Sequence, residues 1–156
     1  MSQVSHDIST LNDLIATTYD SVEGYGEAAK KSENGRFLGL FNERAVERQA
    51  IITALRADVI RLGGEPEDDG TMLAGVHRMF LNLKSVVTGN DDKAIIDEVE
   101  RGEDHIKDKF EDALEDKGLS PEVAHTIRDC YASIKQGHDQ MRDIKHAMEG
   151  DGSPRF

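Results

Sequence analysis

The sequence predicts an all-α fold, a four-helix bundle made of two antiparallel hairpins with a shorter helical crossover between them. The three prolines lie outside the long periodic segments, and a proline inside a helix would break its hydrogen bonding. Apolar residues recur at the three- and four-residue spacing of amphipathic helices, whereas alternating β-branched runs are few. The 156 residues suffice to bury one domain core.

The first predicted helix spans residues 9–31, with Ser9 as its N-cap, and residues 1–8 are expected to form a flexible lead-in. Its inner face carries an apolar stripe made of Leu11, Leu14, Ile15, Val22, Tyr25 and Ala29. Gly24 and Gly26 interrupt this helix, and each costs up to about 1 kcal/mol relative to alanine. We therefore expect a neighbouring helix to approach closely at these glycines.

The second predicted helix spans residues 36–62, after a tight turn at 32–35. It is expected to stop at Gly63 and Gly64, because glycine past a C-terminus allows the left-handed conformation that ends a helix. An acidic loop follows, and residues 71–87 then form the shorter apolar helix of the crossover.

The third predicted helix runs from a cap at residues 90–92 to residue 116, and the fourth from Ser120 to residue 148. Ser120 is a suitable N-cap, and Pro121 suits the first helical position because its missing N–H has no intrahelical partner there. Residues 150–156 form a polar tail that we expect to be flexible. The predicted domain is therefore residues 9–149.

The lengths of the connections predict how the helices are joined. The turns within each pair are short, so each pair should form an antiparallel hairpin. The helix at 71–87 returns the chain from the end of the second long helix to the start of the third. This order is the ferritin-like connectivity of a four-helix bundle.

Glu103 is the most informative polar residue, because it falls on the buried stripe between Val99 and Ile106. A buried carboxylate requires a cation, a metal or a hydrogen-bond donor. Folding the two hairpins at their turns places several further polar side chains at the same mid-helix level. Together with Glu103 they form one predicted layer, whose other members are Glu23, Glu47, Glu100 and His138, with Arg44 and Arg48 beside them.

Three interpretations of this layer stay open. Glu23, Glu100, Glu103 and His138 would suit an iron or manganese site, because such sites combine carboxylates with imidazole. Central Glu-x-x-His pairs are absent, however, and Arg44 and Arg48 would instead pair with the carboxylates in a metal-free salt-bridge layer. In the third interpretation the layer is mostly solvated.

The remaining acidic residues of the third helix are interpreted as a solvated face: Asp97, Glu98, Asp104, Asp108, Glu111 and Asp112. The single cysteine, Cys130, lies in the row of Ile127 and Ile134 and is interpreted as a small core residue. No cofactor is expected in the salt-bridge interpretation.

The formal net charge of −12 argues against nucleic acid and anionic membranes as partners. No apolar run approaches the roughly 18–20 residues of a membrane-spanning helix. The first residues lack the basic and apolar regions of a secretory signal, so we expect a cytoplasmic protein. A second copy of the chain, or another protein, is expected to bind through the helix faces.

Several short motifs resemble a bacterial family of ferritin-like four-helix-bundle proteins of unknown function, over roughly residues 10–147. The more specific ones are Glu-Arg-Gly-Glu-Asp at 100–104 and His-Asp at 138–139; the others are the segment 11–15 with Asp20 and 23–25, Leu-Gly-Gly at 62–64 before Pro66, and His-Arg at 77–78. The resemblance implies a ferritin-like fold without an established activity or ligand. It also implies Glu23, Glu103 and His138 as counterparts of ferritin-type metal ligands.

These observations favour a soluble, non-enzymatic helical bundle with a structural, interaction or stress-associated role. The alternative function is that of an iron- or manganese-binding protein with oxidase-like or metal-storage-like activity. The sequence shows no serine–histidine–acid spacing and no dinucleotide-binding glycine motif that would indicate another enzyme class.

Overall fold

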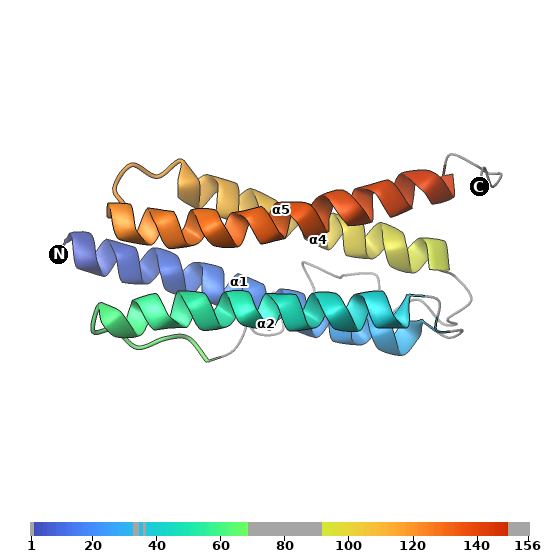
Figure 1. The fold of residues 1–156 in the computed structure, drawn as a ribbon, viewed down its shortest axis with the longest axis horizontal. Coiled ribbons are helices and arrows are strands. Elements are labelled where there is room, and N and C mark those ends of the chain that lie inside the picture. Colours follow the sequence, from blue (N-terminus) through green and yellow to red (C-terminus); the bar gives the residue numbers. More distant parts are fainter. Residues whose placement is uncertain (1, 33–34, 36, 69–91, 150–156) are drawn as a thin grey trace.

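The computed structural model describes residues 2–32, 35, 37–68 and 92–149. Within these ranges the chain forms four long α-helices and no strand: α1 (Gln3–Lys31), α2 (Leu38–Arg61), α4 (Asp92–Leu114) and α5 (Pro121–Glu149). The predicted all-α four-helix bundle is confirmed (Figure 1). The predicted crossover helix at 71–87 and the predicted tail at 150–156 lie outside the described residues.

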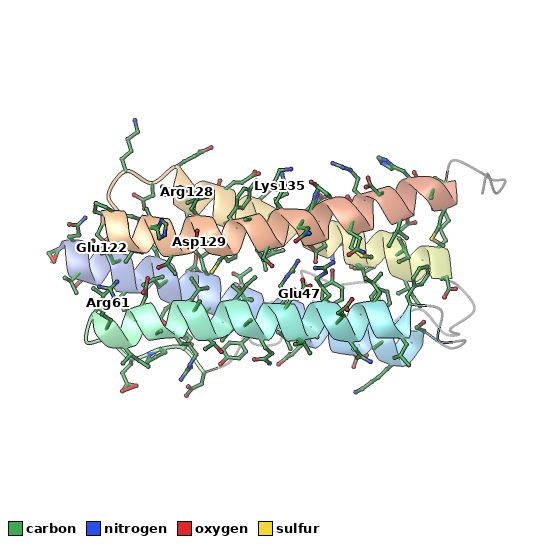
Figure 2. The ribbon with its side chains drawn as sticks, in the orientation of Figure 1. Glu47, Arg61, Glu122, Arg128, Asp129 and Lys135 are labelled. Atoms are coloured by element: carbon green, nitrogen blue, oxygen red, sulfur yellow. The ribbon has the colours of Figure 1, made fainter. Side chains whose placement is uncertain are left out.

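The bundle consists of two helix pairs that pack side by side, α1 with α2 and α4 with α5. The pairs meet where α1 packs against α4 and where α2 packs against α5. Gln3 near the start of α1 donates a hydrogen bond to the carbonyl of Gly118, beyond the end of α4, at 3.0 Å. Helices α1 and α4 are therefore antiparallel, and α2 runs in the same direction as α4. Arg61 at the end of α2 and Glu122 at the start of α5 accordingly lie at the same end of the bundle (Figure 2).

Two helix ends follow the predicted capping chemistry. Gly63 has a φ of 86°, its N–H donates to Ile60 O at 2.9 Å, and the N–H of Gly64 donates to Val59 O at 2.9 Å. This pair of bonds is a Schellman motif, which requires the left-handed residue that glycine supplies. At the start of α5, the Ser120 hydroxyl accepts a hydrogen bond from the N–H of Val123 at 3.4 Å.

Helix α1 begins at Gln3, so residues 3–8 belong to the helix and not to a flexible lead-in. Asp7 is 1% exposed, and its carboxylate accepts a hydrogen bond from the N–H of Ser120 at 3.1 Å. His6 lies 2.6 Å from the carboxylate of Asp116. These contacts hold the first two turns of α1 against the turn between α4 and α5.

A continuous apolar core runs along the bundle, with residues from all four helices. Its largest fully buried apolar side chains are Leu11, Leu14, Ile15, Tyr25, Phe41, Ile52, Leu55, Ile95 and Phe110. The expected close approach at Gly26 is wrong, because a Cβ atom there would meet nothing within 4 Å. In the described residues, no helix has the length and apolar character needed to span a membrane.

Candidate functional site

A buried ion pair between α2 and α4 lies in the middle of the bundle. Arg48 Nη2 lies 2.9 Å from Glu103 Oε1, and the two side chains are 0% and 1% exposed. Arg48 Nη1 also donates to the hydroxyl of Ser21 on α1, at 2.8 Å. The hydroxyl of Tyr25 donates to the other carboxylate oxygen, Glu103 Oε2. We call these four residues the core layer; it joins three of the four helices.

The charges of the core layer balance within the protein interior. Burial raises the pKa of Tyr25 well above its ordinary value, and the charge of Glu103 raises it further, so Tyr25 stays a neutral donor. Burial lowers the pKa of Arg48, but its neighbours, the charge of Glu103 foremost, more than offset that effect, and the pKa is raised. Arg48 and Glu103 therefore form a buried ion pair in which each charge neutralises the other.

Arg44 lies one helical turn before Arg48 on α2 and extends the polar region toward α5. It is 6% exposed and hydrogen-bonds Glu47 on its own helix and Gln140 on α5. Glu47 lines the groove between α2 and α5 (Figure 2). Among the described residues, the Nε atoms of Arg44 and Arg48 have no hydrogen-bond partner.

Gly137 on α5 provides the space that the two arginines occupy. A Cβ atom at position 137 would lie 2.7 Å from Arg48 Nη2 and 3.1 Å from Arg44 Cζ. A side chain at this position would therefore push against the pair that Arg48 forms with Glu103. Sequence reasoning missed Gly137; the signal was a glycine in the middle of a long helix, which costs helix stability unless something packs against it.

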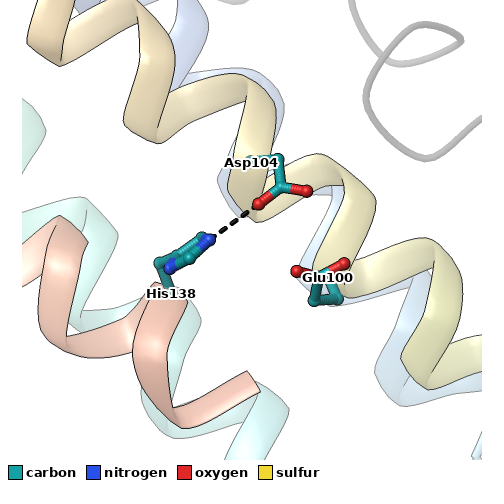
Figure 3. A group of neighbouring side chains, drawn as sticks. All are labelled: Glu100, Asp104 and His138. Carbon is teal, nitrogen blue, oxygen red and sulfur yellow. Dashed lines mark hydrogen bonds and ion pairs between the residues drawn. The ribbon is translucent and has the colours of Figure 1, made fainter. Parts of the chain in front are cut away.

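His138 lies beside the core layer, with one carboxylate near each ring nitrogen. Its Nε2 is 2.7 Å from Asp104 Oδ1 on α4, and its Nδ1 is 3.1 Å from Asp139 Oδ1. Glu100 lies one turn before Asp104 on the same face of α4 (Figure 3). One ligand atom each of Glu100, Asp104 and His138 lie within 4.8 Å of one another, and among the described residues they form the one such group.

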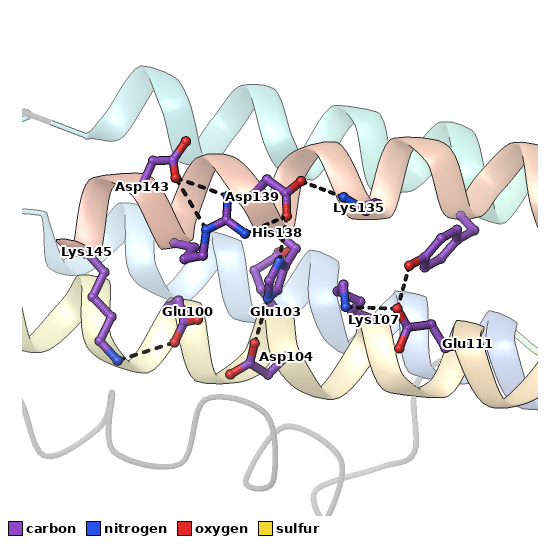
Figure 4. A network of polar contacts seen from close by, with 12 residues as sticks. Glu100, Glu103, Asp104, Lys107, Glu111, Lys135, His138, Asp139, Asp143 and Lys145 are labelled. Carbon is purple, nitrogen blue, oxygen red and sulfur yellow. Dashed lines mark hydrogen bonds and ion pairs between the residues drawn. The ribbon is translucent and has the colours of Figure 1, made fainter. Parts of the chain in front are cut away.

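Lysine side chains on α5 neutralise part of the negative charge around His138 (Figure 4). Lys145 Nζ lies 3.4 Å from Glu100, and Lys135 Nζ lies 2.9 Å from Asp139. The hydrogen bond from Lys135, followed by the bond to His138, lowers the pKa of Asp139 to about 2. Asp139 is therefore ionised throughout the physiological range.

The four residues that the sequence predicted as metal ligands do not lie together in the structure. Glu103 lies in the core layer with Arg48, whereas Glu100 and His138 lie together with Asp104. Glu23 is exposed on α1 and belongs to neither group.

Glu98 and Asp104 both depart from the predicted solvated face. Glu98 is only 4% exposed and pairs with Arg101, so its assignment to that face is wrong. Asp104 is half exposed, yet it contacts His138, which sequence reasoning missed. The sequence feature that could have indicated this contact is the four-residue spacing of Asp104 from Glu100, which places both side chains on one face of α4.

Residues 6–116 match a family described as a domain of unknown function, DUF2383. The chain belongs to this family. No curated protein matches the chain. The DUF2383 match covers α1 from His6 onward, α2 and α4, and with them every residue of the core layer as well as Glu100 and Asp104. It ends before α5, so Gly137 and His138 lie outside the matched part.

Proposed function

We propose that this DUF2383 protein is a non-enzymatic, ferritin-like helical bundle with a structural, interaction or stress-associated role in the cytoplasm. The observation that carries this proposal is the environment of Glu103. Arg48 occupies one of its carboxylate oxygens and Tyr25 occupies the other. A carboxylate that pairs with a guanidinium on one oxygen and a phenol on the other is compensated without a metal.

A dinuclear iron or manganese centre would also need a different charge distribution. Two dications at the bundle centre are normally bound by histidines and by glutamates from all four helices, and the glutamates neutralise their charge. Here Arg48 adds a positive charge at the centre, and Glu23 is exposed. Arg48 would have to give up its ion pair before Glu103 became a ligand, which would leave the charge of Arg48 unpaired in an apolar interior.

The directions of the helices support the ferritin-like part of the proposal. Two antiparallel hairpins, with α2 and α4 running in the same direction, are the arrangement of a bundle with one long crossover. A second copy or another protein is the partner class that we propose for the helix faces. The net charge of −12 disfavours nucleic acid as that partner.

A second candidate function is iron or manganese binding with oxidase-like or storage-like activity. His138 favours it, because an imidazole beside Glu100 and Asp104 is a set of ligands that these metals accept. For a dinuclear centre of that kind, Glu103 would have to join them.

Metal analysis separates the two candidates. The protein is purified without chelators or an affinity tag, its iron and manganese are quantified, and oxygen consumption is followed after addition of Fe(II). We expect well under two of these ions per chain and no oxygen consumption above the buffer rate. About two ions per chain, lost in the Glu103→Ala variant, would contradict the proposal.

A further inference from the structure

We infer that Glu100, Asp104 and His138 form a mononuclear site for a divalent transition-metal ion, separate from the core layer. Two carboxylates from α4 and one imidazole from α5 converge on one place near the surface (Figure 3). A borderline dication such as Zn²⁺ takes three protein ligands of this kind and leaves a fourth position open.

The spacing of the ligand atoms suits one ion after a small adjustment. They lie within 4.8 Å of one another, whereas ligands about 2.1 Å from a tetrahedral zinc ion lie about 3.4 Å apart. Asp104 Oδ1 lies only 2.7 Å from His138 Nε2, and its half-exposed side chain is free to rotate away from the imidazole until an ion fits between the two atoms. His138 is 8% exposed, and α5 holds it in a fixed position.

The second contact of His138 is the independent observation that points to a metal. Its Nδ1 lies 3.1 Å from Asp139, which Lys135 and Arg142 hold in turn. A metal-bound histidine characteristically donates its other N–H to a carboxylate, which directs the remaining nitrogen at the ion. With the proton on Nδ1, the lone pair of Nε2 faces Asp104, and three acceptors converge.

The local charges show what such an ion would neutralise. Glu100 and Asp104 bring two negative charges, and Lys145 lies 3.4 Å from the first of them, Glu100. Among the described residues, His138 is the one side chain that forms an ion pair with Asp104. A proton on Nε2 provides that pairing without a metal, and a dication replaces the proton while neutralising both carboxylates.

Isothermal titration calorimetry of the full chain with Zn²⁺ tests whether the site binds a metal. Titrations with Mg²⁺ and Ca²⁺ test which class of ion it prefers. We expect one Zn²⁺ per chain and no comparable binding of Mg²⁺ or Ca²⁺, because those ions prefer all-oxygen ligands. The absence of Zn²⁺ binding, or equal binding of the three ions, would overturn the inference.

Variants identify the residues that bind the ion. We expect His138→Gln to weaken Zn²⁺ binding at least tenfold, and Asp139→Asn to weaken it by about tenfold through the orientation of the imidazole. His125→Gln is the matched control, because His125 on the same helix lies 3.4 Å from Asp129 in an exposed pair. Unchanged binding in His138→Gln, or an equal loss in His125→Gln, would contradict the assignment.

A gain of affinity provides a test that misfolding cannot imitate. Lys145 competes with the ion for Glu100, so Lys145→Met is expected to tighten Zn²⁺ binding by about two- to fivefold. Weaker or unchanged binding in this variant, with the same circular dichroism as the parent, would count against Glu100 as a ligand.

Discussion

The guanidinium of Arg48 is fully buried, and its surroundings show how the bundle tolerates a charge in its core. Glu103 and Ser21 bind its two terminal nitrogens, and its Cζ lies 5.7 Å from the ring centre of Tyr25. Desolvating two such ions costs several kcal/mol each, which the pairing offsets only when the geometry is good. We therefore assign the pair to the specification of helix register more than to net stability.

Cys130 illustrates a residue whose burial determines its chemistry. It is 7% exposed, and burial raises the pKa of its thiol to about 12, with a smaller contribution from the charges of Asp129 and Asp58. At pH 8 only about one thiol in 10⁴ is then ionised, and the thiolate is the reactive form.

We expect the native chain to react with a thiol reagent at pH 8 at least about a hundredfold more slowly than the same chain in guanidinium chloride. The rate of release of the coloured thiolate measures this difference. Native labelling at the rate of the denatured chain would show that Cys130 is accessible, and that the interpretation as a core residue is wrong.

At the scale of the helix, two glycines in similar positions should respond in opposite ways to alanine. Gly137→Ala places a Cβ atom 2.7 Å from Arg48 Nη2, whereas Gly26→Ala meets nothing within 4 Å. Alanine favours a helix interior over glycine by about 1 kcal/mol, so Gly26→Ala should stabilise the protein by about 0.5–1 kcal/mol. Gly137→Ala should destabilise it by about 1–3 kcal/mol, because Arg48 must shift from Glu103.

Denaturant unfolding followed by circular dichroism measures both free energies of unfolding. If Gly137→Ala were as stabilising as Gly26→Ala, the arginines would not be confined as the structure shows.

The helix ends show which features depend on local sequence alone. Gly63 and Ser120 were predicted as a stop and a cap because each acts on backbone groups within a few residues. The start of α1 was not predicted, because its contacts come from residues more than a hundred positions away. Asp7 contacts Ser120, and Gln3 contacts Gly118.

For the whole molecule, periodicity and turn lengths were enough to predict four helices in two hairpins, and they placed Arg48 and Glu103 in the centre. They did not decide which partner Glu103 selects. A carboxylate on a buried stripe is compatible with an arginine, a metal or a tyrosine, and the choice depends on the rotation of four packed helices. The same rotation leaves Glu23, one position off its stripe, in solvent and brings Asp104 to His138.

The central claim is that Arg48 and Glu103 stabilise each other directly, and a double-mutant cycle measures this interaction. Arg48→Met and Glu103→Leu should each lower the free energy of unfolding by about 3–5 kcal/mol, because each leaves an unpaired buried charge. The double variant removes both charges and should lose less stability than either single variant, which corresponds to a coupling energy of about 3 kcal/mol or more. Glu23→Leu, at an exposed position, should change stability by less than about 0.5 kcal/mol.

The cycle is measured by urea unfolding, with and without a chelator. We predict the same coupling energy in both conditions. Additive single effects, or a loss of stability on chelation that disappears in Glu103→Leu, would show that a metal and not Arg48 holds Glu103.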